Sequence, residues 1–491
     1  MAAYTLILAL VLLVVCPALL LRLAGDRTPV WLQPSTLFIM PWVVALIVYV
    51  SPIFSFREHL EMRHALYIMA AHLCFAVGVV LAGAGRAKPA NVHAVAADPF
   101  PITTKALWVI LFLGLFGNIA VVVDASLTSS LSIFDRVQGD SLSAVRTEQF
   151  ASQMLGIVGP FHRLEQLAPF TLLALPLCIL MPPARSRSSL TLRWFIGANA
   201  LLYLFNGLFV RGGRMDLVIL LLVLLFAAVL DPQKRVKNWI GRLSFLSITL
   251  AAALLSILVL AGLVYFSTSF VQARSGGTSG LLSLVQHHRM DVSPVVGHLF
   301  GYDGPVQYAL LTLSYLVSPL TTFSYYFDLS DASFPGPLWG QYNFPMLAPR
   351  VMRLAQVDTI RYWWDLRLDI FMPLTFQGFG GNVWSTILRD FAVDFGWTAA
   401  ALAMSILGFG SKVLLRSGQA KQSPLILASY CIFTPVLLLS FAHSLLFVQS
   451  LFGAFFFALL IMLYYRMRTF LLPRSIRGRV GRTPGLGRST R

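Results

Sequence analysis

The stretch WFIGANALLYLFNGLFVRGGRMDLVILLLVLLFAAVL, residues 194–230, decides the fold. Two apolar runs within it, 194–209 and 217–230, are each just long enough for a membrane-spanning helix. A polar turn separates the runs, and Arg211 and Arg214 stand at its two ends. The pattern therefore predicts a helical hairpin that holds two arginines at one membrane surface.

Composition indicates a polytopic membrane protein. Of the 491 residues, 57% are hydrophobic and 12% are charged, and the mean hydropathy is +0.76. A soluble globular domain does not need so much apolar residue. The formal charge of +17 would point to nucleic acid in a soluble protein, but here it fits basic loops that set orientation in a membrane. We therefore expect no nucleic-acid partner.

Apolar runs that could form spans recur along the whole chain. They predict an all-α membrane protein with about 11 transmembrane helices. The runs fall at residues 4–21, 35–54, 64–83, 106–123, 167–181, 194–210, 215–230, 243–268, 392–411, 424–441 and 446–465. A further run, Val306–Phe327, is rich in Tyr, Ser, Thr and Pro. We interpret it as a re-entrant or interfacial element, because a full span there would break the charge pattern.

Positive charge predicts how the chain is oriented. When residues 466–491 are placed in the cytoplasm, the short segments on that side hold every lysine and most arginines, as short cytoplasmic loops do. The N-terminus and the arginine turn then lie outside. The outer loops would be 124–166, 269–305 and 328–391, the last forming a helical periplasmic cap. We interpret 1–465 as one membrane domain and 466–491 as a basic, disordered cytoplasmic tail.

The arginine turn has the chemistry of an anion site. Glycines such as Gly213 allow the backbone to approach a ligand closely, and the start of the next helix adds partial positive charge. The forked guanidiniums of Arg211 and Arg214 can each bind phosphate through two parallel hydrogen bonds. We therefore predict a diphosphate site at headgroup depth. The alternative is that both arginines reach toward lipid phosphates without binding a substrate.

A second group of polar residues lies at 378–397, where the last outer loop enters a predicted span. Asp390 and Asp394 are four residues apart, so they share a helix face, and Arg389 lies on a neighbouring face. Carboxylates that enter a membrane helix usually face a partner or a water-filled cavity. A structural ion pair is the alternative interpretation. Arg57 and Arg289, in two other outer loops, are weaker candidates for substrate binding.

Several enzyme classes are excluded by the motifs that the chain lacks. It has no phosphate-binding Walker motif, no HExxH or CxxC metal motif, and no GxSxG nucleophile elbow. The dispersed cysteines predict neither a metal site nor a disulfide framework. Any chemistry would therefore lie outside the cytoplasm, where sugars arrive on polyprenyl diphosphate, and we expect no metal or other cofactor.

Several short segments, in order over roughly 200–410, resemble one family. They are Gly213-Arg214, Tyr315-Leu316-Val317-Ser318-Pro319-Leu320, Gly340-Gln341-Tyr342-Asn343-Phe344, Asn382-Val383-Trp384-Ser385-Thr386 and Asp394-Phe395-Gly396. The family is the Wzy-type oligosaccharide repeat-unit polymerases, which make O-antigen and exopolysaccharide in bacterial inner membranes. The most specific part of the resemblance is the segment from Asn382 to Gly396.

The resemblance implies a GT-C-like glycosyltransferase that needs no metal. Its substrates would be glycans on undecaprenyl diphosphate, with membrane lipids and a flippase and chain-length regulator of the same pathway as partners. Arg211 and Arg214 would stabilise the departing diphosphate. Asn382, Arg389 and Asp394 would position the acceptor or support the arginines, with Asp394 counted among the catalytic residues.

Three other functions remain open at this point, and one of them is a non-catalytic assembly subunit of a polysaccharide secretion complex. A lipid-linked oligosaccharide transporter would usually show paired repeats and a polar site in broken helices at the membrane midplane, and the chain shows neither. An O-antigen ligase would use the same donor and a different acceptor. The sequence does not distinguish a ligase from a polymerase.

Overall fold

The computed structural model shows a helical protein, and all structural statements below concern the residues that it describes. These are 32–57, 59–84, 98–128, 159–181, 190–210, 215–231, 289–300, 305–329, 337–345, 347–356, 370, 385–442 and 444–471. The elements in chain order are α2 (Pro34–Val50), β1 (Phe54–Phe56), α3 (Met62–Ala84), α4 (Thr104–Thr128), α7 (His162–Glu165), α8 (Phe170–Leu180), α9 (Leu190–Phe205), the π-helical turn η2 (Asn206–Val210), α10 (Met215–Leu230), β2 (Met290–Val292), α14 (Pro294–Phe300), α15 (Pro305–Asp328), α16 (Ala348–Leu354), α18 (Ile387–Phe395), α19 (Trp397–Lys421), α20 (Pro424–Leu438), the 3₁₀ turn η3 (Leu445–Phe447) and α21 (Gln449–Leu471).

The length and apolar composition of the described helices are those of a membrane protein. Five are long and apolar enough to cross a membrane, namely Met62–Gly83, Thr104–Thr128, His162–Leu180, Trp397–Lys421 and Ser450–Arg468. Four apolar helices are shorter, namely Pro34–Val50, Trp194–Val210, Met215–Leu230 and Pro424–Leu438. They match the predicted runs in order. The predicted runs 4–21 and 243–268 lie outside the described residues.

Predicted boundaries are wrong at two places near the C-terminus. The predicted run 392–411 is divided, because α18 ends at Phe395 and α19 starts at Trp397 and continues to Lys421. Gly396, between them, has a φ of 81°, a backbone conformation that favours glycine. Farther on, α21 extends to Leu471, so the helix includes the first residues that we predicted as tail.

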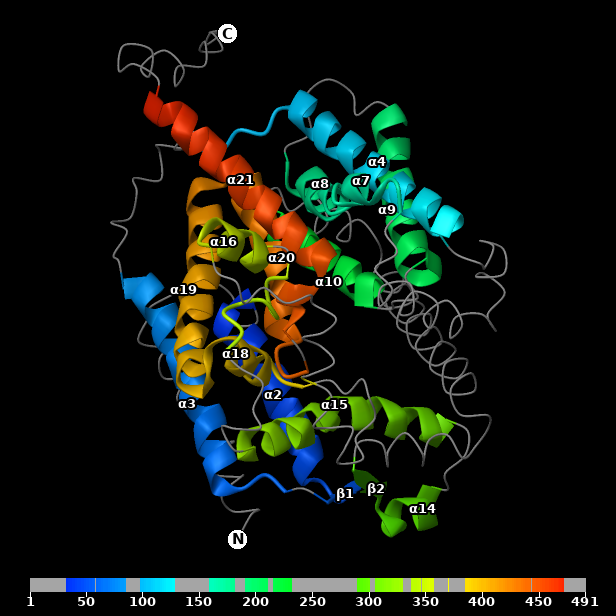
Figure 1. Cartoon of the computed structure of the whole chain (residues 1–491), viewed down its shortest axis with the longest axis vertical. Helices are drawn as coiled ribbons and strands as arrows, with labels where there is room; N and C mark the ends of the chain where they lie inside the picture. The colour runs from blue at the N-terminus through cyan, green and yellow to red at the C-terminus, as the bar shows by residue number, and fades with distance from the viewer. Residues whose placement is uncertain are drawn as a thin grey trace, which may run out of the picture.

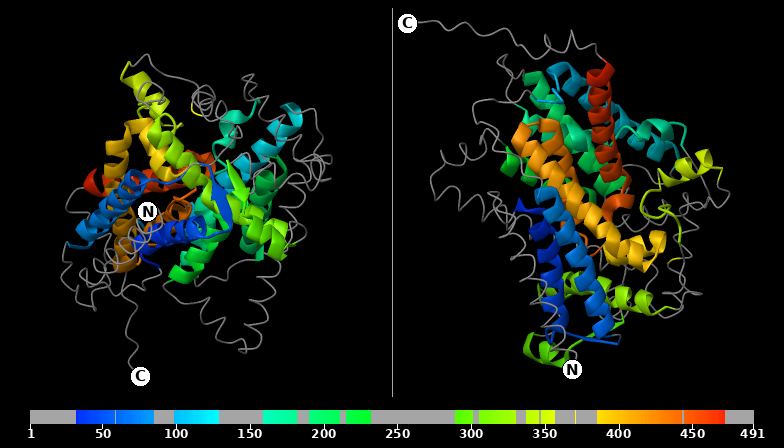
Figure 2. Two further views of the ribbon diagram at one scale, coloured as in Figure 1. Left: turned by 90° about the horizontal axis from the view of Figure 1, so that it is seen from below. Right: turned by 90° about the vertical axis from the view of Figure 1, so that its left-hand side faces the viewer.

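The run 306–327 is a continuous helix, α15, that lies across the bundle. Figure 1 shows α15 across the lower ends of α2 and α3, and Figure 2 shows the same arrangement from the side. It is not among the described helices long and apolar enough to span a membrane, which agrees with an interfacial position. Its C-terminal end is held to α3 by His64, whose Nε2 lies 2.7 Å from Asp328 Oδ1.

The protein is otherwise helical, and two segments that we predicted in outer loops pair as a small two-stranded sheet. Strands β1 and β2 pair antiparallel, with Ser55 opposite Asp291.

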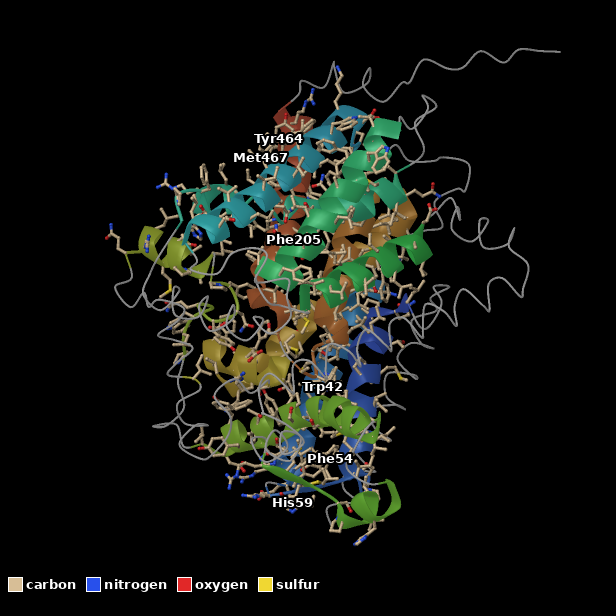
Figure 3. All side chains as sticks on the ribbon, turned by 90° about the vertical axis from the view of Figure 1, so that its right-hand side faces the viewer. Trp42, Phe54, His59, Phe205, Tyr464 and Met467 are labelled. Carbon is tan, nitrogen blue, oxygen red and sulfur yellow. The ribbon has the colours of Figure 1, made fainter. Side chains whose placement is uncertain are left out.

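Figure 3 shows Phe54 and His59 at one end of the molecule and Tyr464 and Met467 at the other. The structure thus separates a predicted outer loop from a predicted cytoplasmic helix end.

Helices α3 and α19 pack closely along glycines. A Cβ at Gly78 would overlap the carbonyl oxygen of Ser405, and one at Gly408 would overlap that of Phe75. Small residues allow such close contact between membrane helices, where lipid supplies no hydrophobic drive for their association. The pair therefore depends on these two glycines.

Gly408→Val is expected to destabilise the protein by about 1–3 kcal/mol, the usual cost of overpacking. The matched control is Gly410→Val on the same helix, because a Cβ at Gly410 meets nothing within 4 Å. Thermal unfolding of both variants in detergent, followed by size-exclusion profile, checks this. If both variants lost the same stability, the close contact between α3 and α19 at Gly408 would not be the cause of the loss.

Candidate functional site

Helix α18 is short and charged, and its residues from Ile387 to Asp394 are all buried. Its start is capped by Thr386, whose Oγ1 accepts a hydrogen bond from the amide of Arg389 at 3.3 Å. Arg389, Asp390 and Asp394 are all 0% exposed. In Figure 1, α18 lies in the interior beside α19. Buried charges are costly unless they are paired and hydrogen-bonded, so the partners of α18 define the site.

Asp394 holds a loop that comes from far earlier in the chain. Its Oδ1 accepts a hydrogen bond from the amide of Tyr342 at 3.0 Å, and its Oδ2 accepts from the amide and from Nδ2 of Asn343 at 2.8 and 2.7 Å. The amide of Trp339 donates to the carbonyl of Asp394 at 2.9 Å. The positive φ of Trp339 and of Gly340, 54° and 85°, turns the loop back toward α18. Two of the segments that carry the family resemblance therefore form one unit.

Two opposing effects act on the pKa of the Asp394 carboxyl group. Burial raises the pKa of Asp394 to about 6, and the hydrogen bonds from Asn343 and Tyr342 oppose that rise. A group that is fully enclosed and accepts three hydrogen bonds has little capacity left to contact a substrate directly. Its geometry suits a residue that fixes the loop on the helix.

Arg389 and Asp390 form a buried ion pair beneath two aromatic rings. Arg389 Nε lies 2.9 Å from Asp390 Oδ1. The guanidinium carbon is 4.8 Å from the ring centre of Tyr326 and 5.7 Å from that of Tyr342, within the range of cation–π attraction. Burial acts to lower the pKa of Arg389, but Asp390 and the two tyrosines outweigh it and the pKa lies above its usual value. The pair therefore joins α15, the Tyr342 loop and α18.

Residues 440–450 connect α18 to the helix that follows the arginine turn. The amide of Ile387 donates to the carbonyl of Ser440 at 2.8 Å, and the amide of Ser444 donates to Asp390 Oδ2 at 2.7 Å. At the other end of this segment, Ser450 Oγ donates to Asp216 Oδ1 at 3.0 Å. Asp216 lies in the first turn of α10. One short segment thus contacts both predicted halves of the site.

The flank of the turn on the α9 side is anchored by polar groups. Tyr203 OH donates to Asp216 Oδ1 at 3.1 Å. Asn206 Nδ2 donates to both the carbonyl and Oδ1 of Asn118 at 2.9 Å. Asn206 begins η2, and π-helical turns in α-helices often mark functional sites. The predicted site residues Arg211, Gly213, Arg214 and Asn382 themselves lie outside the described residues.

Asp124 is a charged residue that sequence reasoning missed. We placed it at the start of an outer loop, but α4 continues to Thr128 and Asp124 is 4% exposed. Its Oδ1 accepts from the amide of Phe161 at 2.9 Å. Its neighbour Val121 packs against Val210 in a small apolar cluster, one residue before the arginine turn. The sequence signal that could have identified Asp124 is its position directly after an apolar run, at 106–123.

Arg57 and Arg289, predicted in separate loops, are adjacent in the structure. The amide of Arg57 donates to the carbonyl of Arg289 at 3.1 Å. Arg57 Nε lies 3.7 Å from Asp291 Oδ2, and both side chains are about half exposed. The two arginines belong to the β1–β2 end of the molecule, which Figure 1 shows beyond α15.

His64 is another residue that the sequence did not single out. It is 0% exposed, and its Nδ1 accepts from the amide of Glu61 at 2.9 Å. An amide only donates, so Nδ1 is the unprotonated nitrogen and Nε2 donates to Asp328. Arg63 binds the same Asp328 carboxylate at 2.9 Å. Because both ring nitrogens are used, His64 acts as a tether between α3 and α15.

Comparison with protein-family models, with curated proteins and with solved structures finds no match to this chain. The resemblance to the repeat-unit polymerases therefore stays a prediction that rests on the residues quoted for it.

Proposed function

We propose that this protein is a glycosyltransferase that polymerises oligosaccharide repeat units carried on undecaprenyl diphosphate. It would act on the periplasmic face of a bacterial inner membrane, with its N-terminus in the periplasm and its C-terminus in the cytoplasm. The charge distribution along the chain supports this orientation. A flippase that delivers the repeat units and a regulator of chain length are the proposed partners.

One observation carries the proposal. The carboxylate of Asp394 binds the amides of Tyr342 and Asn343, so two segments that resemble the polymerases form a single buried unit. Ser444 and Ser450 also link α18 to Asp216 in the first turn of α10, the helix that follows the arginine turn in the sequence. A set of unrelated sequence matches would have no reason to converge in this way.

The residues divide into two roles in this proposal. Arg211 and Arg214 bind the donor diphosphate and stabilise the charge that it gains on leaving. Arg389 and Asp394, which are 0% exposed and engaged by protein groups, act as positioning residues. They fix α18 and the Tyr342 loop so that the acceptor meets the donor in a defined orientation.

The reaction itself is a single displacement. A hydroxyl oxygen of the acceptor sugar forms a bond to the anomeric carbon of the donor, and the bond from that carbon to the diphosphate oxygen breaks. Undecaprenyl diphosphate leaves with the electron pair, and the hydroxyl proton passes to the diphosphate or to solvent. Because the leaving group is already a stable anion, arginines that bind it supply the main protein contribution.

Loss of the gene should shorten the surface glycan without removing it. Cells that lack the protein are expected to carry single repeat units in place of long chains, because each unit is still made and exported. Gel analysis of the surface glycan checks this outcome. Complete loss of surface sugar would instead indicate a transporter and would contradict the proposal.

A further inference from the structure

Three buried side-chain oxygens on residues beside α18 have no hydrogen-bond partner among the residues that the structure describes. They are Ser385 Oγ, Ser444 Oγ and Asn343 Oδ1, and all three residues are 0% exposed. Most buried polar atoms in folded proteins are paired, because an unpaired one is costly. Three such atoms on residues that lie along one nine-residue helix indicate a polar binding site.

All three residues are tied to α18, so their positions are fixed. The amide of Ser444 donates to Asp390 Oδ2 at 2.7 Å. Asn343 Nδ2 donates to the carbonyl of Asp390 at 2.7 Å. Ser385 directly precedes Thr386, which caps the helix. The oxygens come from three distant parts of the chain and are held by one helix, which is the arrangement of a preorganised site.

The orientation of the Asn343 amide follows from its neighbours. Its Nδ2 lies 2.7 Å from both the carbonyl of Asp390 and Oδ2 of Asp394. Both of these atoms only accept hydrogen bonds, so the nitrogen must face them. The unpaired atom is therefore the carbonyl oxygen Oδ1, which accepts hydrogen bonds and cannot donate.

The hydrogen-bonding properties of the three oxygens determine which class of ligand fits them. A serine hydroxyl can donate or accept, whereas Asn343 Oδ1 needs a donor. A diphosphate offers acceptors, so it would leave Oδ1 unsatisfied, and the carboxylate of Asp394 would repel it. A neutral ligand with hydroxyl groups both donates and accepts. The adjacent Arg389–Asp390 pair adds no net charge.

We propose that Ser385, Ser444 and Asn343 form a subsite for hydroxyl groups of the acceptor saccharide. The inference rests on the proposed function and deepens it. The acceptor binds through neutral hydroxyls at α18, and the donor binds through its diphosphate at the arginine turn. This separation lets one substrate be recognised without competition from the charge of the other.

The test compares the double variant Ser385→Ala/Ser444→Ala with Ser423→Ala. Ser423 is a matched control, because its Oγ is also buried without a partner among the described residues, but it stands at the start of α20, a helix length away from Ser440. None of the three hydroxyls has a partner in the part of the chain that the structure describes, so these variants should fold as the wild type does. Asn343 is left intact because its amide also holds Asp394.

Binding is measured on the full-length protein in detergent with two probes. One is the repeat-unit oligosaccharide of the same cells, released from its lipid diphosphate by mild acid, and the other is undecaprenyl diphosphate. The double variant should bind the oligosaccharide about tenfold or more weakly, which corresponds to two lost hydrogen bonds. Its affinity for undecaprenyl diphosphate should not change, and Ser423→Ala should match the wild type with both probes.

Unchanged oligosaccharide affinity in the double variant would overturn the subsite, since the hydroxyls would then bind water only. An equal loss in Ser423→Ala would overturn it too. If the wild type elongates no glycan but the double variant still loses oligosaccharide binding selectively, the subsite stands and the proposed function fails. If Arg214→Ala abolishes elongation while the double variant elongates and binds normally, the subsite alone fails.

Discussion

Asp390→Asn is expected to lower the free energy of unfolding by about 3–5 kcal/mol, the usual result of removing one partner of a buried ion pair. Arg389 would keep its charge, since the guanidinium is not deprotonated in proteins, and would lose the carboxylate 2.9 Å away. The asparagine still offers an oxygen to the amide of Ser444. The expected loss is therefore mainly electrostatic.

A second variant separates the charge effect from a packing effect. Arg389→Met/Asp390→Leu removes both charges together and keeps the apolar stems, and such replacements are often neutral or stabilising. We expect it to recover most of the stability that Asp390→Asn loses, measured by chemical unfolding in mixed micelles. If the double variant is as unstable as Asp390→Asn, the ion pair is not the unit that holds α18.

Arg214→Ala is expected to reduce the rate of chain growth by about 10²–10³-fold, the range for loss of one preorganised donor to a developing negative charge. Arg211→Ala should have an effect of the same order. Arg214→Lys should also be impaired, because an ammonium is a point charge and cannot supply two parallel hydrogen bonds to phosphate. The glycan ladder from cells that express each variant at equal level reports the effect.

Arg350→Ala is the matched control for these variants. It removes the same charge from the same predicted outer side, and Arg350 is an exposed residue of α16. It should give a wild-type ladder. A wild-type ladder from both arginine-turn variants, or full activity of Arg214→Lys, would favour arginines that only contact lipid phosphates.

The membrane helices could be predicted from the sequence, because a long apolar run in lipid has one low-energy conformation. The helices before and after the arginine turn are an example, because α9, η2 and α10 follow the predicted runs. The break at Gly396 could not be predicted in the same way. Apolar residues continue on both sides of it, and hydropathy does not record the backbone angle of one glycine.

The candidate site was predicted only in part, and long-range contacts are the reason. The spacing of Asp390 and Asp394 placed them correctly on one helix. Their partners, Ser444 and Asn343, are separated from them by 54 and 51 residues. No local pattern encodes a hydrogen bond across that distance. Arg389 is a second example of a contact that the sequence did not predict. We expected it to bind a substrate, but in the structure it is buried and paired with Asp390.

The most direct test of the central claim is the product formed by the purified protein in liposomes that contain only the lipid-linked repeat unit. The account predicts a ladder of lipid-linked glycans that differ by one repeat unit, with one undecaprenyl diphosphate released for each step. Repeat units that move across the bilayer without any increase in length would contradict it.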